Sequence, residues 1–148
     1  MSAITPGAKH HAALAPLASR FVAVAELPWE KTRFPGIETK TLLVDRASGV
    51  CTVLMKMAPG APLPDHEHVL VEQTYVLEGS LACGEGECRA GEFVWRPAGS
   101  RHAARGGPQG GLMLAIFQVP NRFFEADGRE LDLLGQDWDA TWGRALFR

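Results

Sequence analysis

The sequence predicts an all-β protein, a small antiparallel β-barrel or sandwich, and three observations support this. The 148-residue chain holds 16 Gly and 10 Pro, more than a typical globular domain, and frequent turn residues favour short strands. Residues 38–119 alternate between short β-prone segments and turns. Nothing in that stretch has the periodicity of a helix of ordinary length. We therefore expect about eight short strands there.

The expected strands are short apolar or alternating segments, at residues 41–44, 50–57, 72–78, 81–83, 87–89, 93–95, 101–105 and 112–119. Proline cannot donate to a strand ladder, so we expect Pro62 and Pro64 to break it. Gly79 should end the strand that begins at Glu72. The glycine-rich residues 106–111 are expected to form a flexible loop.

We expect three segments along the chain. Residues 1–37, rich in Ala and Pro at their start, form an N-terminal arm and lead-in, residues 38–119 the barrel, and residues 120–148 a partly helical tail. Asp137 is a plausible N-cap, and Trp138 and Trp142 have helical spacing. We expect a short C-terminal helix whose tryptophans pack on the barrel or on a partner subunit.

Composition argues against several classes of partner. There are 15 Lys and Arg against 17 Asp and Glu, a net charge of −2, which argues against binding nucleic acid through bulk positive charge or an anionic membrane surface. No apolar run approaches the roughly 18 residues of a membrane-spanning helix. Without an export signal we expect a cytoplasmic protein with reduced cysteines. Cys83 and Cys88 flank a turn, and we expect half-buried thiols there rather than a disulfide.

Two linked sequence patterns contain the candidate functional residues. The first, G-x5-H-x-H-x3-E-x6-G, begins at Gly60 and contains His66, His68 and Glu72, and the second, G-x5-P-x-G-x2-H, ends at His102. Two histidines at i and i+2 on a strand point to one side, about 7 Å apart at the backbone. A straight strand would carry Glu72 about 20 Å beyond His66, so the chain must reverse just before Glu72. His102 must come from a distant strand.

Three neutral imidazoles and a carboxylate suit a divalent transition ion. Fe(II), Mn(II), Ni(II), Zn(II) and Cu(II) accept such ligands, whereas Mg²⁺ and Ca²⁺ prefer oxygen. We therefore expect His66, His68, Glu72 and His102 to hold one metal ion, with Glu72 also a candidate catalytic base.

The two patterns match, at all nine specified positions, the motifs of the cupin superfamily. This resemblance implies a jelly-roll barrel. It also implies a homodimer, since cupins commonly pair their sheets. Many cupins have a glycine in the reversal before the third ligand, whereas this sequence has Val69, Leu70 and Val71.

The segments 59–62 and 76–80 resemble two branches of cupins. One contains non-haem iron dioxygenases that cleave β-diketones and related ketones, and the other is the cupin domain of zinc-binding anti-sigma factors. The first branch implies a metal held by three histidines alone. Glu72 departs from that pattern and matches the four-ligand set of the zinc domains and of many other cupin oxygenases.

Three functions follow as alternatives. The first is an Fe(II) dioxygenase that cleaves a small β-diketone or related enolisable ketone with dioxygen, in which Glu72 stays bound or acts as a base. The second is a Zn(II)-binding sensory module whose cavity takes a signal molecule, although about 35 leader residues leave little room for a sigma-binding domain. The third is a metal-dependent isomerase or lyase, which we rank lower because few basic residues are placed to hold a phosphate.

Several side chains are candidates to line the substrate pocket: Met55, Met57, Phe93, Trp95, Phe117 and Gln118. Gln118 is the polar exception in an apolar strand, so we expect it to donate a hydrogen bond into the pocket. Gln73 and Tyr75 should point away if Glu72 points inward. Arg96 and Arg101 are expected to be solvated.

Overall fold

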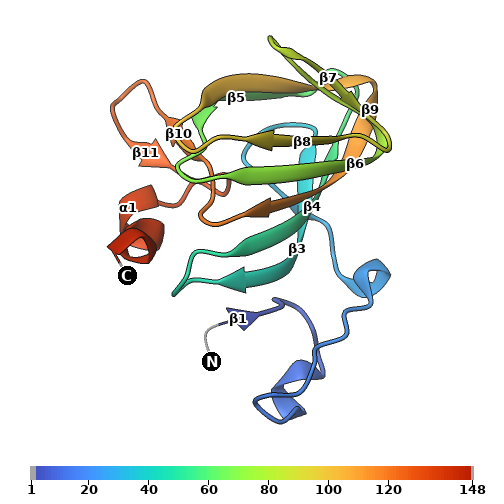
Figure 1. Ribbon diagram of the computed structural model, residues 1–148, viewed down its shortest axis with the longest axis vertical. Helices are drawn as coiled ribbons and strands as arrows, with labels where there is room; N and C mark the ends of the chain where they lie inside the picture. The colour runs from blue at the N-terminus through green and yellow to red at the C-terminus, as the bar shows by residue number, and fades with distance from the viewer. Residues whose placement is uncertain (1–2, 148) are drawn as a thin grey trace.

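The computed structural model describes residues 3–147, which form a curled antiparallel sheet with a short helix at the C-terminal end (Figure 1). The strands are β1 (Ala3–Ile4), β2 (Glu30–Lys31), β3 (Ile37–Asp45), β4 (Cys51–Met57), β5 (Pro62–Glu67), β6 (Glu72–Cys83), β7 (Gly86–Arg89), β8 (Phe93–Arg96), β9 (Arg101–Phe117), β10 (Arg122–Phe124) and β11 (Glu130–Leu131). The helical segments are η1 (His11–Ala13), η2 (Val24–Glu26), α1 (Trp138–Trp142) and η3 (Gly143–Phe147). The predicted all-β fold is confirmed.

Strand β9 connects the parts of the sheet. One series of neighbours runs β1-β3-β4-β9-β5-β10-β11, and β6 pairs with β7, β8 and β9. All of these pairs are antiparallel. Because β9 pairs with both β5 and β6, this strand, which carries His102, joins the strand that carries His66 to the strand that carries Glu72.

Residues 106–111 lie within β9, so the prediction of a flexible loop is wrong. The physical reason is close packing of backbones. A Cβ at Gly110 would lie 2.6 Å from the carbonyl oxygen of Met57, and one at Gly111 would lie 2.6 Å from that of Ser80. These glycines allow neighbouring backbone segments to approach β9 more closely than a side chain would permit.

Gly79 does not end a strand either, because β6 continues through it to Cys83. The register between β6 and β9 shifts between Gly79 and Leu81. Gly79 has φ +62°, and a Cβ there would collide with the carbonyl oxygen of Gly110. The glycine therefore permits an irregularity inside the strand rather than a turn.

Pro62 and Pro64 lie inside β5: Pro62 stays in the ladder opposite Arg105, contrary to the prediction, whereas the ladder is interrupted at Pro64, as predicted. The pairing of β5 with β9 shifts register between Leu63 and His66, which takes up Pro64 in an irregular segment. A proline lacks the N–H group for regular pairing, and such irregularities are where strands accommodate it. Pairing resumes with His66 opposite His102.

The C-terminal tail packs on the barrel. Asp137 caps α1, its carboxylate accepting a hydrogen bond from the Ala140 N–H at 2.8 Å. Trp138 is fully buried, and its Nε1 donates to the Pro120 carbonyl at 2.9 Å. Trp138 and Trp142 share a core cluster with five residues of the barrel region: Val44, Cys51, Ala115, Phe117 and Val119. Of the two expected partners for the tryptophans, the structure places them on the barrel.

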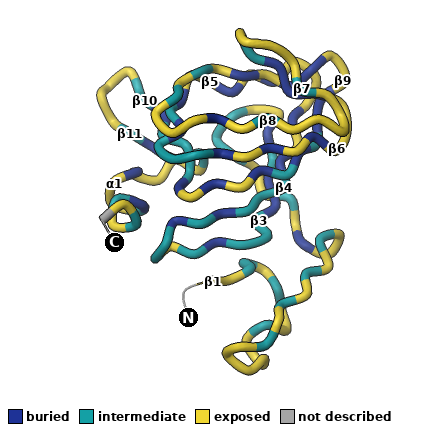
Figure 2. Tube along the Cα trace, viewed as in Figure 1, coloured by how far each residue is buried: buried dark blue, intermediate teal, exposed yellow. Residues whose placement is uncertain are grey.

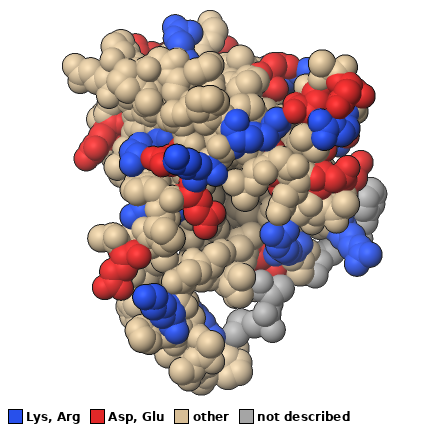
Figure 3. Space-filling model, turned by 180° about the vertical axis from the view of Figure 1, so that it is seen from behind, with Lys and Arg blue, Asp and Glu red and all other residues tan. Residues whose placement is uncertain are grey.

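The N-terminal arm loops out beyond the edge of the sheet formed by β1 and β3 and is largely exposed (Figure 2). Leu17 and Phe21 are 98% and 90% exposed. None of the helices in residues 3–147 is long and apolar enough to cross a membrane. The face seen from behind carries acidic and basic side chains in small mixed groups (Figure 3), in keeping with the near-neutral net charge.

Candidate metal centre

Three imidazole rings converge inside the barrel. His66 lies on β5, His68 directly follows that strand, and His102 lies on β9 opposite His66. The ring centroids are 4.9 Å apart for His66 and His68, 4.8 Å for His66 and His102, and 5.0 Å for His68 and His102. One nitrogen from each ring lies within 4.8 Å of the others. This arrangement could hold one metal ion with small side-chain movements.

The orientation of His66 is fixed by its own strand. Its Nδ1 lies 2.8 Å from the carbonyl oxygen of Pro64. Because a carbonyl only accepts, Nδ1 carries the proton, which leaves the Nε2 lone pair free. A backbone hydrogen bond of this kind commonly orients a histidine that binds a metal.

The other two rings have unsatisfied nitrogens in the interior. His68 is 1% exposed, and neither of its ring nitrogens has a hydrogen-bond partner among the described residues. The same holds for Nδ1 of His102. A buried polar atom without a partner is costly, and a metal ion would supply the missing partner. The donor set therefore fits a divalent transition ion.

Glu72 begins β6 and reaches the same region because the chain reverses at residues 69–71. Its Oε2 lies 3.3 Å from Nδ1 of His68, a close contact that is not aligned as a regular hydrogen bond. Its Oε1 accepts a hydrogen bond from Oγ1 of Thr74 at 3.1 Å. Glu72 thus lies beside the three imidazoles, outside their compact group.

The reversal needs no glycine. The His68 N–H donates to the Ser100 carbonyl at 2.8 Å, and the Gly99 N–H donates to the His68 carbonyl at 2.7 Å. No described residue other than glycine has positive φ. The loop before β9 therefore holds the reversal in place.

The surroundings of His66, His102 and Glu72 favour the protonation states in which these side chains bind a metal ion. Burial lowers the pKa of His66, and burial together with the Arg96 charge lowers the pKa of His102 to about 3. Burial alone would raise the pKa of Glu72, but its contacts with His68 and Asn121 outweigh this and lower that pKa. At neutral pH, His66 and His102 are therefore neutral and Glu72 is ionised.

A second group, Cys83, Glu85 and His102, also has suitably spaced donor atoms. Arg96 already occupies it: Nη1 lies 3.4 Å from Oε1 of Glu85 and Nη2 lies 3.7 Å from Sγ of Cys83. A guanidinium so close disfavours another cation. The three histidines are the better candidate.

Residues 18–121 match the family model described as the ChrR cupin-like domain. The chain belongs to this family. A putative acetylacetone dioxygenase from Methylibium petroleiphilum PM1 is structurally similar to this cupin, with a TM-score of 0.70 and 20% identity over 87% of this chain and 97% of the other.

Two further structures are similar to this cupin. An acetylacetone dioxygenase from Acinetobacter johnsonii has a TM-score of 0.69 and 17% identity, covering 88% of this chain and 93% of the other. The Rhodobacter sphaeroides complex of SigE with the anti-sigma ChrR has a TM-score of 0.55 and 21% identity, covering 64% of this chain and 50% of the other. A search of curated proteins gives no significant match. The structural likenesses support the cupin fold.

The cavity beside the histidines is small, about 30 Å³. Its wall contains Met55 and Phe117 together with Glu72 and Thr74. A space of this size holds an ion or one to two water molecules. It does not hold a whole β-diketone.

Three predicted pocket residues point away from the cavity of this cupin. Phe93 and Trp95 are 53% and 58% exposed, on the outer face of β8, and Gln118 is exposed after β9. The prediction that they line the cavity is wrong, because strand alternation turns their side chains outward. Met57 is buried in the hydrophobic core but does not belong to the cavity wall.

Sequence reasoning missed three polar residues in the wall, Thr74, Arg96 and Asn121, besides five apolar ones: Leu63, Leu81, Ala104, Met113 and Ala115. Arg96 was expected to be solvated, yet it is 8% exposed. Thr74 could have been found, since it shares a strand face with Glu72. Asn121 follows the last expected strand, where no periodicity indicates its direction.

The remaining predictions concern the exposure of polar side chains and thiols outside the cavity. Gln73 and Tyr75 are exposed, as expected from the inward direction of Glu72. Arg101 is exposed and forms an ion pair with Asp65. Cys83 and Cys88 are free thiols of intermediate exposure.

Proposed function

We propose that this cupin binds one divalent transition-metal ion through His66, His68 and His102, with Glu72 as a fourth ligand or a nearby base. The observation that carries this proposal is the set of buried imidazole nitrogens that have no partner among the described residues. Neutral histidines and an ionised carboxylate are the forms that bind such an ion.

We further propose that the protein is an Fe(II)-dependent dioxygenase that cleaves a small β-diketone or related enolisable ketone. The ion, when bound, would orient the substrate oxygens and stabilise enolate charge. Glu72 is suited to accept the proton that the ketone loses on enolisation, because it is ionised and Thr74 orients its other oxygen. Arg96, also in the wall, adds positive charge near the developing anion.

The deciding experiment is metal analysis of protein purified without chelator or added metal, combined with oxygen uptake on a panel of β-diketones. We expect one metal ion per chain, and oxygen consumption matching diketone loss after Fe(II) loading. Tight metal binding without oxygen uptake on any diketone would overturn the dioxygenase proposal and leave the metal centre standing.

A Zn(II)-binding sensory module is the second candidate. Membership of the ChrR cupin-like family and the small cavity at the histidines favour it. If this candidate is right, the protein copurifies with zinc and consumes no oxygen with any diketone. Its melting temperature then changes when a signal molecule binds. Mn(II) or Ni(II) in the purified protein would instead favour a different metal-dependent reaction.

We also propose that the protein is a homodimer in the cytoplasm. Several large apolar side chains lie exposed on the outer face of the sheet formed by β6, β8 and β9: Tyr75, Leu77, Phe93, Trp95 and Ile116. Contiguous apolar patches of this kind commonly mark contacts between proteins.

A further inference from the structure

The ring of Phe123 packs against the ring of His66. Phe123 lies on β10 opposite His66 of β5, and the two ring centroids are 5.1 Å apart with an interplanar angle of 41°. Phe123 is 2% exposed and belongs to the hydrophobic core. In the sheet, His66 therefore lies between His102 of β9 and Phe123 of β10.

Two contacts restrict the direction of the His66 ring. Its Nδ1 donates to the Pro64 carbonyl at 2.8 Å, which leaves Nε2 as the donor atom for a metal. A ring held by one hydrogen bond alone can still turn about that bond. The closely packed ring of Phe123 limits this rotation, because side chains in a dense core are held in one arrangement by their neighbours.

Two residues from the segment before β3 also contact this aromatic pair. The ring centroids of Phe34 and Phe123 are 4.9 Å apart. The guanidinium carbon of Arg33 lies 4.4 Å from the centroid of the Phe34 ring and 5.3 Å from that of Phe123. The four side chains thus form a continuous series of contacts that ends at the metal centre: Arg33, Phe34, Phe123 and His66.

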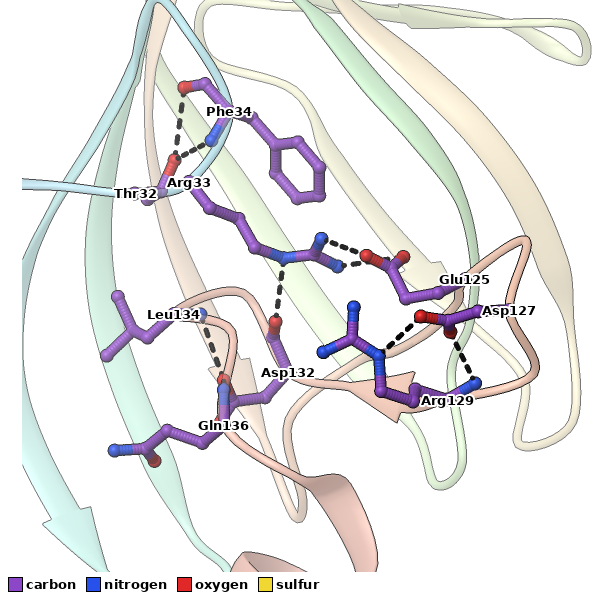
Figure 4. Close-up of polar contacts among 9 residues, drawn as sticks. All are labelled: Thr32, Arg33, Phe34, Glu125, Asp127, Arg129, Asp132, Leu134 and Gln136. Atoms are coloured by element: carbon purple, nitrogen blue, oxygen red, sulfur yellow. Dashed lines mark hydrogen bonds and ion pairs between the residues drawn. The ribbon is translucent and has the colours of Figure 1, made fainter.

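Arg33 is tied to the C-terminal tail (Figure 4). Its Nη1 and Nη2 donate to the two carboxylate oxygens of Glu125 at 2.6 and 3.4 Å, and its Nε donates to the Asp132 carbonyl at 3.2 Å. Paired bonds between a guanidinium and a carboxylate fix the geometry of both groups. Because Glu125 directly follows β10, the ion pair holds Arg33 and Phe34 beside Phe123.

We propose that Phe123 is a positioning residue for the metal centre, and that Arg33 and Phe34 hold it against His66. This inference rests on the proposed metal centre and gives the C-terminal tail a role in it. Phe123 and Glu125 lie beyond residue 121, where the match to the family model ends. Groups that orient a metal ligand from one step away change metal affinity by roughly 10–100-fold.

The first test compares Phe123→Leu with Trp138→Phe. Both remove buried aromatic volume from the tail, but Trp138 belongs to a different core cluster. The probe is Co(II), titrated against a competing chelator well below the melting temperature, with the visible absorption of the bound ion recorded. We expect Phe123→Leu to weaken Co(II) binding roughly tenfold and to change this absorption, and Trp138→Phe to lower only the melting temperature.

Two results would overturn the proposal. One is a Co(II) affinity and spectrum of folded Phe123→Leu equal to those of the native protein. The other is an equal loss of affinity in Phe123→Leu and Trp138→Phe, because the effect would then come from lost stability alone.

A second readout needs no metal. At about pH 8, above the ordinary histidine pKa, nitrogen NMR of the ring shows which nitrogen carries the proton. Native His66 should be a single tautomer protonated at Nδ1, because of its bond to Pro64. In Phe123→Leu the freed ring should populate both tautomers. An unchanged single tautomer in this variant would contradict the positioning of His66 by Phe123.

Arg33→Met covers the case in which Phe123→Leu does not fold. Its matched control is Arg129→Met, which breaks the exposed ion pair of Arg129 with Asp127 in the same β10–β11 hairpin (Figure 4). We expect Arg33→Met to weaken Co(II) binding about threefold, less than the loss of Phe123 itself because it acts one contact further away. Arg129→Met should leave Co(II) affinity unchanged, and equal affinities in the two variants would overturn the role of Arg33.

The double variant tests whether Arg33 acts through Phe123. Residues that act through one contact give non-additive effects, so adding Arg33→Met to Phe123→Leu should weaken Co(II) binding no further. Losses that multiply would overturn this route from Arg33 to His66.

Failure of the proposed function gives a different result. A native protein that binds no Co(II), Fe(II) or Zn(II), but whose His66 ring loses its single tautomer in Phe123→Leu, would reject the metal centre and support the contact that orients His66. Metal binding that depends on Phe123, without oxygen uptake on any diketone, would reject the dioxygenase and support the positioning role.

Discussion

His66 enters the candidate metal centre with its ring already oriented, because its Nδ1 donates to the Pro64 carbonyl. His68 has no such support, and its neighbour is the Glu72 carboxylate. The three imidazoles form the compact group of donor atoms and Glu72 lies beside it, so substitution of a histidine and substitution of Glu72 should have different effects.

We expect His66→Ala, His68→Ala and His102→Ala each to abolish metal binding at stoichiometric metal, because each removes one of three nitrogen donors. Glu72→Gln leaves the three imidazoles, so metal content should fall only in part while turnover falls more strongly. Metal analysis and melting curves measure the effect, since metal stabilises the folded form. His10→Ala, in the arm, is the control. Full metal content in His102→Ala would contradict a shared centre.

Acid should destabilise the metal-free protein. Folding lowers the pKa of His66, and that of His102 to about 3, whereas both are about 6.5 in an unfolded chain. The unfolded chain then binds more protons, so the free energy of unfolding falls as pH drops below about 6.5. Glu72 acts in the same direction, because its lowered pKa gives stability that is lost as pH falls through the folded value.

The measurement is urea unfolding of metal-free protein at several values between about pH 7.5 and 4, in the window around the unfolded histidine pKa. Double substitution of His66 and His102 by Gln should make the free energy of unfolding depend less on pH in the upper part of this range. A free energy of unfolding that does not change across this range would contradict the burial of neutral histidines.

Cys51 should be chemically inert in the folded protein. It is buried, and burial raises the pKa of its thiol to about 12, so very little thiolate is present at pH 8. We expect iodoacetamide to leave Cys51 unmodified until urea unfolds the chain, while the half-buried Cys83 and Cys88 react in the folded protein. Mass spectrometry of peptides checks this, and rapid labelling of native Cys51 would contradict its burial.

At the scale of elements, β6 and β9 meet where glycine is required. We expect Gly79→Ala to lower the free energy of unfolding by roughly 2–5 kcal/mol, from strain at positive φ and a clash with a carbonyl. Gly84→Ala is the control, because a Cβ there meets nothing within 4 Å. Urea unfolding of both variants checks this, and equal stabilities would contradict the close packing of the two strands.

The strand pattern predicted much of this architecture because alternation and turn residues are local signals. The reversal before Glu72 was predictable as well, since a straight strand could not bring it to His66. Gly79 was misinterpreted because glycine serves both tight turns and close backbone approach, and local sequence does not separate the two. Phe93 and Trp95 were placed inside because hydrophobicity does not tell which face of a strand is covered.

At the scale of the whole molecule, the exposed apolar face of β6, β8 and β9 is the surface on which we propose that the homodimer forms. We expect a dimer at micromolar concentration in light scattering, and a monomer after the double substitution Phe93→Ser and Trp95→Ser. Both side chains point away from the metal cavity, so metal content should stay unchanged. A native protein that is monomeric at these concentrations would contradict the proposed homodimer.

The central position of β9 also has a consequence for how the chain folds. This strand contributes His102, yet its partners β4, β5 and β6 all precede it along the chain. Contacts between segments distant in sequence form slowly, because long loops must close first. During synthesis, His66, His68 and Glu72 leave the ribosome well before His102. In the proposed metal centre, tight binding of an ion would therefore follow only after β9 has been made and has closed the barrel, so a bound ion would indicate that β9 has docked.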